Sequence, residues 1–192
     1  MPESGKWSDP WLIVVGVGTL AYPIIVYLGL PHLPPYVLVV LALLLMAGRA
    51  LFARSDRLPA IGPWGMVWCG GVLALLLLIA PLLAAKAYPV VLSLALAVTF
   101  AASLVRPPTL IERLARLQHP ALPAPAIGYT RIVTWVWTVF LLGNGALAAG
   151  LAVWGSLEQW TLWTSLGAYL ATGVIFAIEW SIRQVLLRRW AS

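Results

Sequence analysis

Residues 131–154 read RIVTWVWTVFLLGNGALAAGLAVW, and residues 160–182 read WTLWTSLGAYLATGVIFAIEWSI. Each run is long enough to cross the hydrocarbon core of a bilayer, which needs about 20 apolar residues as a helix. The five residues between them, Gly155–Gln159, are too few for anything but a turn. Together they predict a transmembrane hairpin.

The rest of the chain contains four more apolar runs of similar length. Of the 192 residues 62% are hydrophobic and 9% are charged, whereas soluble domains are about 25% charged. The sequence therefore predicts an all-α integral membrane protein, a single polytopic domain of residues 1–192 with six transmembrane helices in three hairpins. The expected spans are Trp11–Leu30, Tyr36–Phe52, Val67–Ala85, Pro89–Val105, Arg131–Trp154 and Trp160–Ile182.

Short turns are expected within the first two hairpins as well. Residues 31–35 contain three prolines, which favour a tight turn over a continuous helix. Lys86–Tyr88, just before Pro89, is expected to be the turn between the third and fourth spans.

The basic residues predict the orientation. Eleven of the twelve lysines and arginines fall on one side of the expected membrane, and only Lys86 falls on the other. The side that carries most Lys and Arg is normally cytoplasmic. Both termini are therefore expected in the cytoplasm. The net charge of +6 is interpreted as a consequence of membrane orientation rather than as a sign of nucleic-acid binding.

Residues 106–129 form the largest segment expected outside the bilayer. Thr109–Glu112 has the spacing of a capping box, and the following residues predict a short amphipathic helix in the inner headgroup layer. The proline-rich stretch His119–Pro125 is expected to be extended. The segment is interpreted as an interfacial linker or, alternatively, as a docking surface for an acidic headgroup or a cytoplasmic partner. The candidate docking residues are Arg54, Arg57, Arg106, Arg113 and Arg116.

Two polar residues lie inside the expected spans. Glu179 is predicted to form an ion pair with Arg131 that fastens the last hairpin; alternatively, it carries a proton or binds a cationic group. Asn144, in the middle of its span, is predicted to hydrogen-bond between helices, with substrate binding as the alternative.

Small residues recur at four-residue spacing in the last two spans. Ala146 precedes Gly150, Gly167 precedes Ala171, and Gly173 precedes Ala177. Such spacing lets helix backbones approach closely. It predicts contact between the fifth and sixth spans or with a second copy of the chain.

The sequence offers no recognisable catalytic, cofactor-binding or metal-binding constellation. Nucleophile-elbow, zinc-helix and P-loop motifs are absent. Cys69 is the only cysteine, and the two histidines, His32 and His119, are expected on opposite sides of the membrane. The chain is therefore expected not to be an enzyme and to need no cofactor.

One resemblance covers roughly residues 106–183. The run PTLIERLAR at residues 108–116, the proline-rich stretch and Tyr129–Arg131 before a Trp- and Asn-containing span resemble uncharacterised small bacterial inner-membrane proteins. Members of that group are similar to proteins encoded beside fatty-acid- or polyketide-like genes for aryl-polyene pigments. The arrangement more loosely resembles the intracellular septation protein A family. The resemblance implies an envelope role in the bacterial inner membrane and no particular reaction.

These observations leave three functional hypotheses. The first is a non-enzymatic accessory or scaffold protein in envelope or lipid-like product assembly. The second is a carrier or binding protein for an amphipathic anionic lipid, acyl or polyene substrate. The third is an enzyme acting on lipid-linked substrates. The expected partners are membrane lipids and a second copy or another membrane or cytoplasmic protein, and not nucleic acid.

Overall fold

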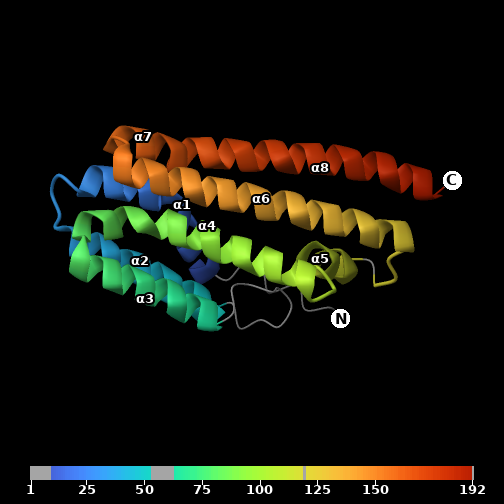
Figure 1. Ribbon diagram of the computed structural model, residues 1–192, viewed down its shortest axis with the longest axis horizontal. Helices are drawn as coiled ribbons and strands as arrows, with labels where there is room; N and C mark the ends of the chain where they lie inside the picture. The colour runs from blue at the N-terminus through green and yellow to red at the C-terminus, as the bar shows by residue number, and fades with distance from the viewer. Residues whose placement is uncertain (1–9, 53–62, 119, 192) are drawn as a thin grey trace.

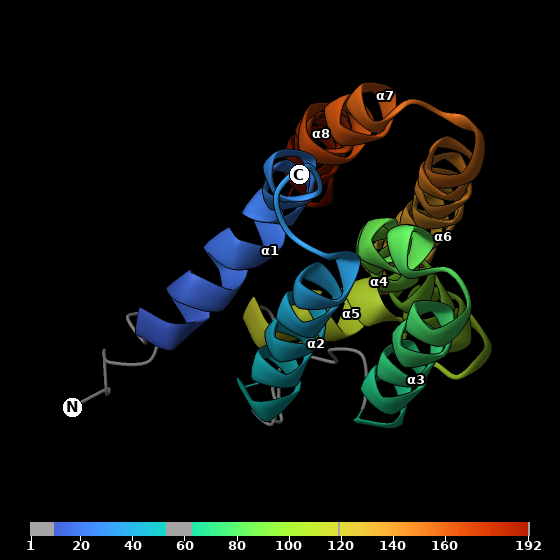
Figure 2. The same ribbon diagram turned by 90° about the vertical axis from the view of Figure 1, so that its left-hand side faces the viewer.

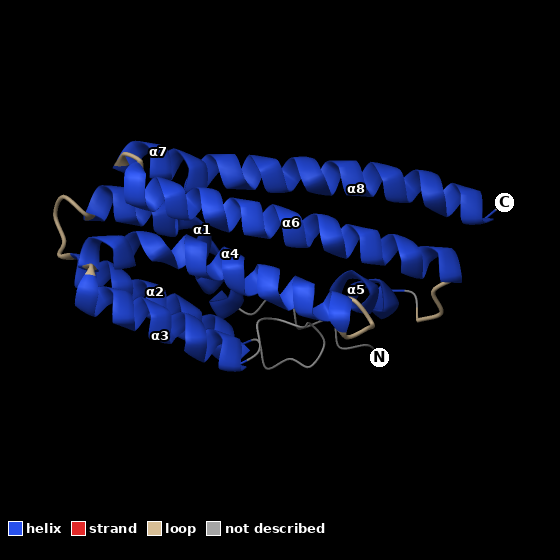
Figure 3. Cartoon of the chain, viewed as in Figure 1, coloured by secondary structure: helices blue, strands red, loops and turns tan. Residues whose placement is uncertain are grey.

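The computed structural model describes residues 10–52, 63–118 and 120–191, and every regular element in this part of the chain is a helix (Figure 3). The prediction of an all-α fold is confirmed. In chain order the elements are α1 (Pro10–Gly29), α2 (Pro35–Phe52), α3 (Pro63–Ile79), α4 (Pro81–Val105), α5 (Leu110–Gln118), α6 (Ala124–Trp154), α7 (Leu157–Leu162), the π-helical turn η1 (Trp163–Gly167) and α8 (Ala168–Ala191).

The long helices lie side by side, with their tight turns gathered at one end (Figure 1). This turn end carries residues 30–34, Ala80 and residues 155–156. The opposite end carries α5 and the C-terminus and is called the α5 end. Helix α4 packs against α2, α3 and α6 (Figure 2). Helix α5 is seen nearly end-on in Figure 1 and from its side in Figure 2, so it lies across the long helices.

The second turn lies earlier in the chain than expected. Helix α3 ends at Ile79 and α4 begins at Pro81, so the prediction of a turn at Lys86–Tyr88 is wrong. Proline is favoured in the first turn of a helix, because a backbone N–H there would have no partner within the helix. Pro81 starts α4 in this way. Lys86 consequently lies inside α4, where its side chain is only 8% exposed.

The other proline of this region, Pro89, lies in the interior of α4. It has no N–H to donate to the carbonyl of Ala85 four residues earlier. That carbonyl instead accepts a hydrogen bond of 2.9 Å from the hydroxyl of Tyr22 on α1. The same hydroxyl lies 3.2 Å from the carbonyl oxygen of Leu38 on α2. The hydroxyl of Tyr22 thus links α1 to the carbonyls of α2 and α4 near the turn end.

The core at the turn end is built on aromatic rings. Tyr22 and Tyr88 lie with their ring centroids 4.7 Å apart. Trp160 of α7 is wholly buried with them. Because fully burying large side chains contributes about 1.5–3 kcal/mol each, this cluster stabilises the packing of α7 against the bundle.

Three helical stretches are long and apolar enough to cross a membrane: Pro81–Val105, Ala124–Trp154 and Leu157–Leu186. Shorter apolar helical stretches cover Val17–Gly29, Pro35–Gly48 and Val67–Ile79. At about 1.5 Å per residue, α6 with its 31 residues spans about 46 Å, more than the roughly 30 Å hydrocarbon core. Helices α6 and α8 therefore extend beyond their neighbours at the α5 end (Figure 1).

Helix α6 begins earlier in the chain than expected, within the proline-rich stretch. Extended backbone reaches only to Pro123, and α6 begins at Ala124 with Pro125 in its first turn. The predicted span therefore starts about two turns too late, because the proline content of residues 119–125 predicts an extended linker although proline is well tolerated in a first helical turn.

Helix α5 occurs where the capping-box spacing predicts a helix. The backbone N–H of Glu112 donates to the hydroxyl of Thr109 over 3.3 Å. Within α5, however, the charged Glu112 is only 6% exposed whereas the apolar Leu117 is 55% exposed, the reverse of a simple amphipathic pattern. The carboxylate of Glu112 can be buried because Arg116 neutralises it, with an N–O distance of 2.7 Å.

Small residues bring α6 close to α4 rather than to α8. A Cβ added at Gly145 would lie 2.9 Å from Cδ2 of Leu94 on α4, while one added at Gly143 would meet nothing within 4 Å. At Gly173 of α8 a Cβ would likewise meet nothing within 4 Å. The predicted close contact between the last two spans is therefore not made at these glycines.

This difference gives a matched pair of variants. We expect Gly145→Val to lower the free energy of unfolding by about 1–3 kcal/mol, since overpacking a tight contact costs that much. Gly143→Val, two residues away, is expected to change it by less than about 0.5 kcal/mol. Unfolding titrations in mixed detergent and dodecyl sulfate measure both. Equal losses for the two variants would contradict the α4–α6 contact.

Candidate functional site

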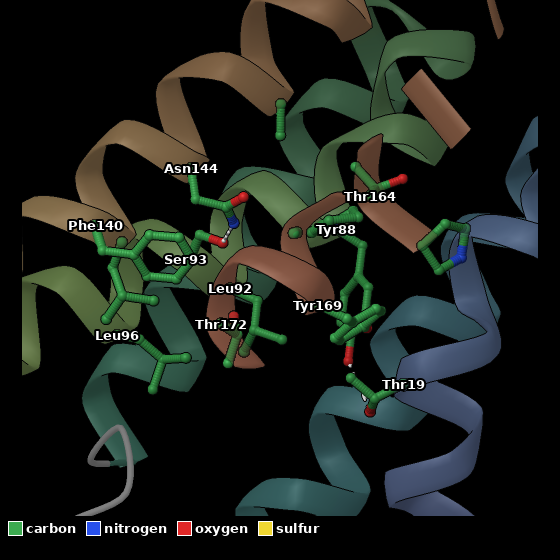
Figure 4. Close-up of a pocket in the computed structure, with 15 residues that line it drawn as sticks. Thr19, Tyr88, Leu92, Ser93, Leu96, Phe140, Asn144, Thr164, Tyr169 and Thr172 are labelled. Atoms are coloured by element: carbon green, nitrogen blue, oxygen red, sulfur yellow. Dashed lines mark hydrogen bonds between the residues drawn. The ribbon is translucent and has the colours of Figure 1, made fainter. Parts of the chain in front are cut away.

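The structure places two groups of residues that could bind a ligand, one in the middle of the bundle and one at the α5 end. The first is centred on Asn144 of α6. Its side-chain N–H donates to the hydroxyl of Ser93 on α4 over 2.9 Å (Figure 4). Its carbonyl accepts a hydrogen bond of 3.1 Å from the indole N–H of Trp163. Both ends of the amide are occupied by protein partners, so this geometry joins α4, α6 and η1.

The π-helical turn positions Trp163. A Cβ added at Gly167 would lie only 2.6 Å from Cε3 of the Trp163 ring. The ring therefore lies directly over the Gly167 backbone, and its indole N–H reaches Asn144 from there. Turns of this kind are frequent at functional sites; here the turn orients a tryptophan toward an amide in the middle of the bundle.

A small cavity of about 150 Å³ adjoins this group. Its walls include Tyr88, Leu92, Phe140 and Thr172 (Figure 4), and the hydroxyls of Thr19 and Tyr88 lie 3.3 Å apart at its edge. The space is of the order of a few water molecules. It is too small for a lipid or an acyl-aromatic molecule.

The second group surrounds a much larger cavity of about 730 Å³ at the α5 end. Ligand sites for small molecules commonly enclose about 300–1,000 Å³. Helices α5, α6 and α8 form its walls, together with Leu122 from the segment before α6. The remaining lining residues are Ile111, Leu114, Ala115, Ala126, Tyr129, Thr130, Val133, Trp137, Phe176, Ala177, Glu179, Trp180, Arg183 and Gln184.

This α5-end cavity has an apolar and a polar end. Trp137 and Phe176, which lie on the turn-end side of the cavity, are in contact with their ring centroids 4.7 Å apart and their planes tilted by 56°. Glu179, Arg183 and Gln184 follow further along α8. A bound molecule would thus meet aromatic rings at one end and hydrogen-bonding groups at the other.

Glu179 has different partners from the one expected. Its Oε1 lies 3.5 Å from Nε of Arg183 and 3.3 Å from the hydroxyl of Tyr129, which also donates to the backbone carbonyl of Glu179 over 3.2 Å. Arg131 is exposed and makes no ion pair with Glu179, so the predicted Glu179–Arg131 pair is wrong. Arg183, four residues further along the same helix, lies on the same face as Glu179 and takes that place.

The arginines of the predicted docking surface have mostly structural contacts. Nε of Arg113 donates to the carbonyl oxygen of Pro108 over 2.8 Å. Its Nη2 lies 3.4 Å from the backbone carbonyl oxygen of Arg106. Arg116 donates to Glu112 and, over 3.3 Å, to the carbonyl of Pro120. Arg106 is exposed. Arg54 and Arg57 lie outside the described residues.

Several lining residues of the α5-end cavity were not singled out from the sequence. The four-residue spacing of Glu179 and Arg183 was a signal for their pairing. Nothing in the sequence marked Tyr129 as the hydrogen-bond donor to Glu179, and nothing distinguished Trp137 and Phe176 from the other aromatic residues. Among the described residues no group of three or more His, Cys, Asp or Glu side chains gathers where a metal ion could bind.

The described chain thus has the architecture of a helical protein with membrane-length apolar helices and an amphipathic cavity at one end. No family model, curated protein or solved structure matches it. The resemblance of residues 106–183 to small inner-membrane proteins stays a prediction.

Proposed function

We propose that this chain is a six-span protein of the bacterial inner membrane with both termini in the cytoplasm, and that it binds an amphipathic molecule in the α5-end cavity. The proposal adopts the second of the functions expected from the sequence. The observation that carries it is the 730 Å³ cavity between α5, α6 and α8, aromatic at one end and charged at the other. Binding, without a chemical step, is the whole of the proposed activity.

The orientation rests on the basic residues and on helix length. The three turns at one end carry no lysine or arginine, whereas Arg106, Arg113, Arg116 and Arg183 lie toward the other. Because basic residues favour the cytoplasmic side, the α5 end is proposed to face the cytoplasm.

The cavity then lies at the inner edge of the membrane. A hydrocarbon core of about 30 Å takes up about 20 helical residues, which counts from the turn end to about Trp135 on α6 and Phe176 on α8. Trp135 and Trp180 are exposed there, as expected of rings at headgroup level. The apolar end of the cavity therefore adjoins the acyl chains, and Glu179 and Arg183 lie among the headgroups.

An amphipathic occupant fits this placement. Its apolar part would bury surface against Trp137 and Phe176, at about 25 cal/mol per Å² removed from contact with water. Its polar head would stay at the level of Glu179 and Arg183. No residue of α8 with a described side chain is buried, so a lipid-soluble molecule has a lateral route into the cavity from the bilayer.

The scaffold function remains a second candidate on a separate observation. Gly173 lies on a part of α8 where nothing approaches within 4 Å of the position of a Cβ, and small residues on an open face favour association of membrane helices. A second copy of the chain or another membrane protein would pack there.

Native mass spectrometry of the protein, extracted gently from its own membrane, separates the two functions. The proposed function predicts a monomer that retains one molecule of lipid or acyl-aromatic mass. A dimer or a complex with another protein, with no small molecule retained, would instead support the scaffold and contradict the proposal.

A further inference from the structure

The headgroup end of the α5-end cavity carries an ion pair that is only partly satisfied. Nε of Arg183 and Oε1 of Glu179 are 3.5 Å apart, beyond the usual 2.7–2.9 Å of a charge-assisted hydrogen bond. In the described part of the chain, Oε2 of Glu179 and the two terminal nitrogens of Arg183 have no hydrogen-bond partner. The two side chains thus keep most of their hydrogen-bonding capacity.

The two charges differ in how they meet the surroundings. The side chain of Glu179 is 15% exposed and that of Arg183 is 45% exposed. Both line the cavity. The acceptor therefore lies deeper, beside Tyr129, and the guanidinium lies nearer the mouth, where its planar fork can bind a phosphate with two hydrogen bonds.

From this arrangement we infer that the cavity selects an amphiphile whose head carries both a phosphate and a primary ammonium group. The ammonium N–H groups donate to Glu179, and the phosphate accepts from Arg183. This inference rests on the proposed function and specifies its ligand class.

Purely anionic heads fit the site less well. Arg183 is the one cationic side chain among the described residues that line the cavity. Arg113 and Arg116 of α5 do not line it, and they already donate to backbone carbonyls and to Glu112. An anionic head would meet the carboxylate of Glu179, and among the described lining residues Arg183 alone would compensate it. A quaternary ammonium head matches the charges but has no N–H to donate.

The test uses three single-chain phospholipids that share one acyl chain and differ in the head: ethanolamine, choline or glycerol. Delipidated protein is mixed with equal amounts of the three in detergent micelles, and the retained lipid is identified by native mass spectrometry. We expect the ethanolamine lipid to be retained about tenfold over the choline lipid, because a hydrogen bond to a charged group is lost in the latter.

Two variants assign the preference to the ion pair. Glu179→Gln is expected to abolish the preference for ethanolamine over choline while lipid is still retained. Arg183→Gln is expected to weaken retention of both zwitterionic lipids equally. Folding of each variant is checked by its detergent unfolding midpoint.

The outcomes separate the inference from the proposed function. Retention of all three lipids without preference, or a preference for the glycerol head, would overturn the inference and leave lipid binding intact. The inference would also be overturned if Glu179→Gln kept the ethanolamine preference. Failure of the wild-type protein to retain any of the three would overturn the proposed function as well.

Discussion

Replacing Gly167 with valine is expected to destabilise the chain by about 2–6 kcal/mol, the largest stability effect of any substitution considered. The first atom of the new side chain would lie 2.6 Å from Cε3 of Trp163. A tryptophan ring cannot bend away as the end of a leucine can, so the ring must swing out. Overpacking costs about 1–3 kcal/mol, and the amide of Asn144 would lose its partner at a further cost of about 1–3 kcal/mol.

Two controls isolate this mechanism. Gly173→Val introduces the same side chain on α8 where nothing lies within 4 Å, and it is expected to leave the detergent unfolding midpoint nearly unchanged. Trp163→Phe keeps an aromatic ring but removes the N–H that donates to Asn144, and it is expected to cost about 1 kcal/mol. A loss for Gly173→Val as large as that for Gly167→Val would show that a valine anywhere in η1 or α8, and not the displaced ring, causes the effect.

Filling the α5-end cavity with Ala177→Trp is expected to lower retention of an amphipathic ligand by at least about tenfold. Ala177 lines the cavity, and an indole there would displace at least two methylene groups of the ligand. Each buried methylene contributes about 0.8 kcal/mol, and about 1.4 kcal/mol corresponds to a factor of ten.

Ile178→Trp is the matched control. Ile178 is the next residue of α8, is 55% exposed and does not line the cavity. The Ile178→Trp variant is expected to retain the ligand as the wild type does. Native mass spectrometry of equal amounts of each protein measures this. If both variants lost ligand equally, the α5-end cavity would not be the binding site. If neither lost any, the ligand would lie elsewhere.

The helical class was predictable because it follows from local features. Long apolar runs, the three prolines of residues 31–35 and the capping spacing at Thr109 each act over a few residues. The turn at Ala80 is not predictable in this way, because Pro81 and Pro89 lie in one apolar run and the charge of Lys86 indicates an end of that run. Only the buried surroundings of Lys86 show that this lysine belongs to the helix.

The α5-end cavity was not predictable because it depends on how far apart two helices lie. The expected Glu179–Arg131 pair assumed that α6 and α8 pack along their whole length. In the structure, Trp137–Phe176 and Tyr129–Glu179 join them at that end, and the space between and around these contacts forms part of the cavity. Helix α6 packs against α4 and α5, whereas α8 does not pack closely against these helices, and no single run of sequence records that difference.

The central claim is that the space between α5, α6 and α8 holds the apolar part of an amphipathic molecule. The most direct measurement is photolabelling of the wild-type protein with a single-chain lipid that carries a diazirine in its tail, followed by peptide mapping. We predict labelling on the residues that line the apolar end, Val133, Trp137, Phe176 and Ala177, and its loss when unlabelled lipid is added in excess. Labelling spread over the exposed faces of α1, α3 and α8 without competition would contradict the account.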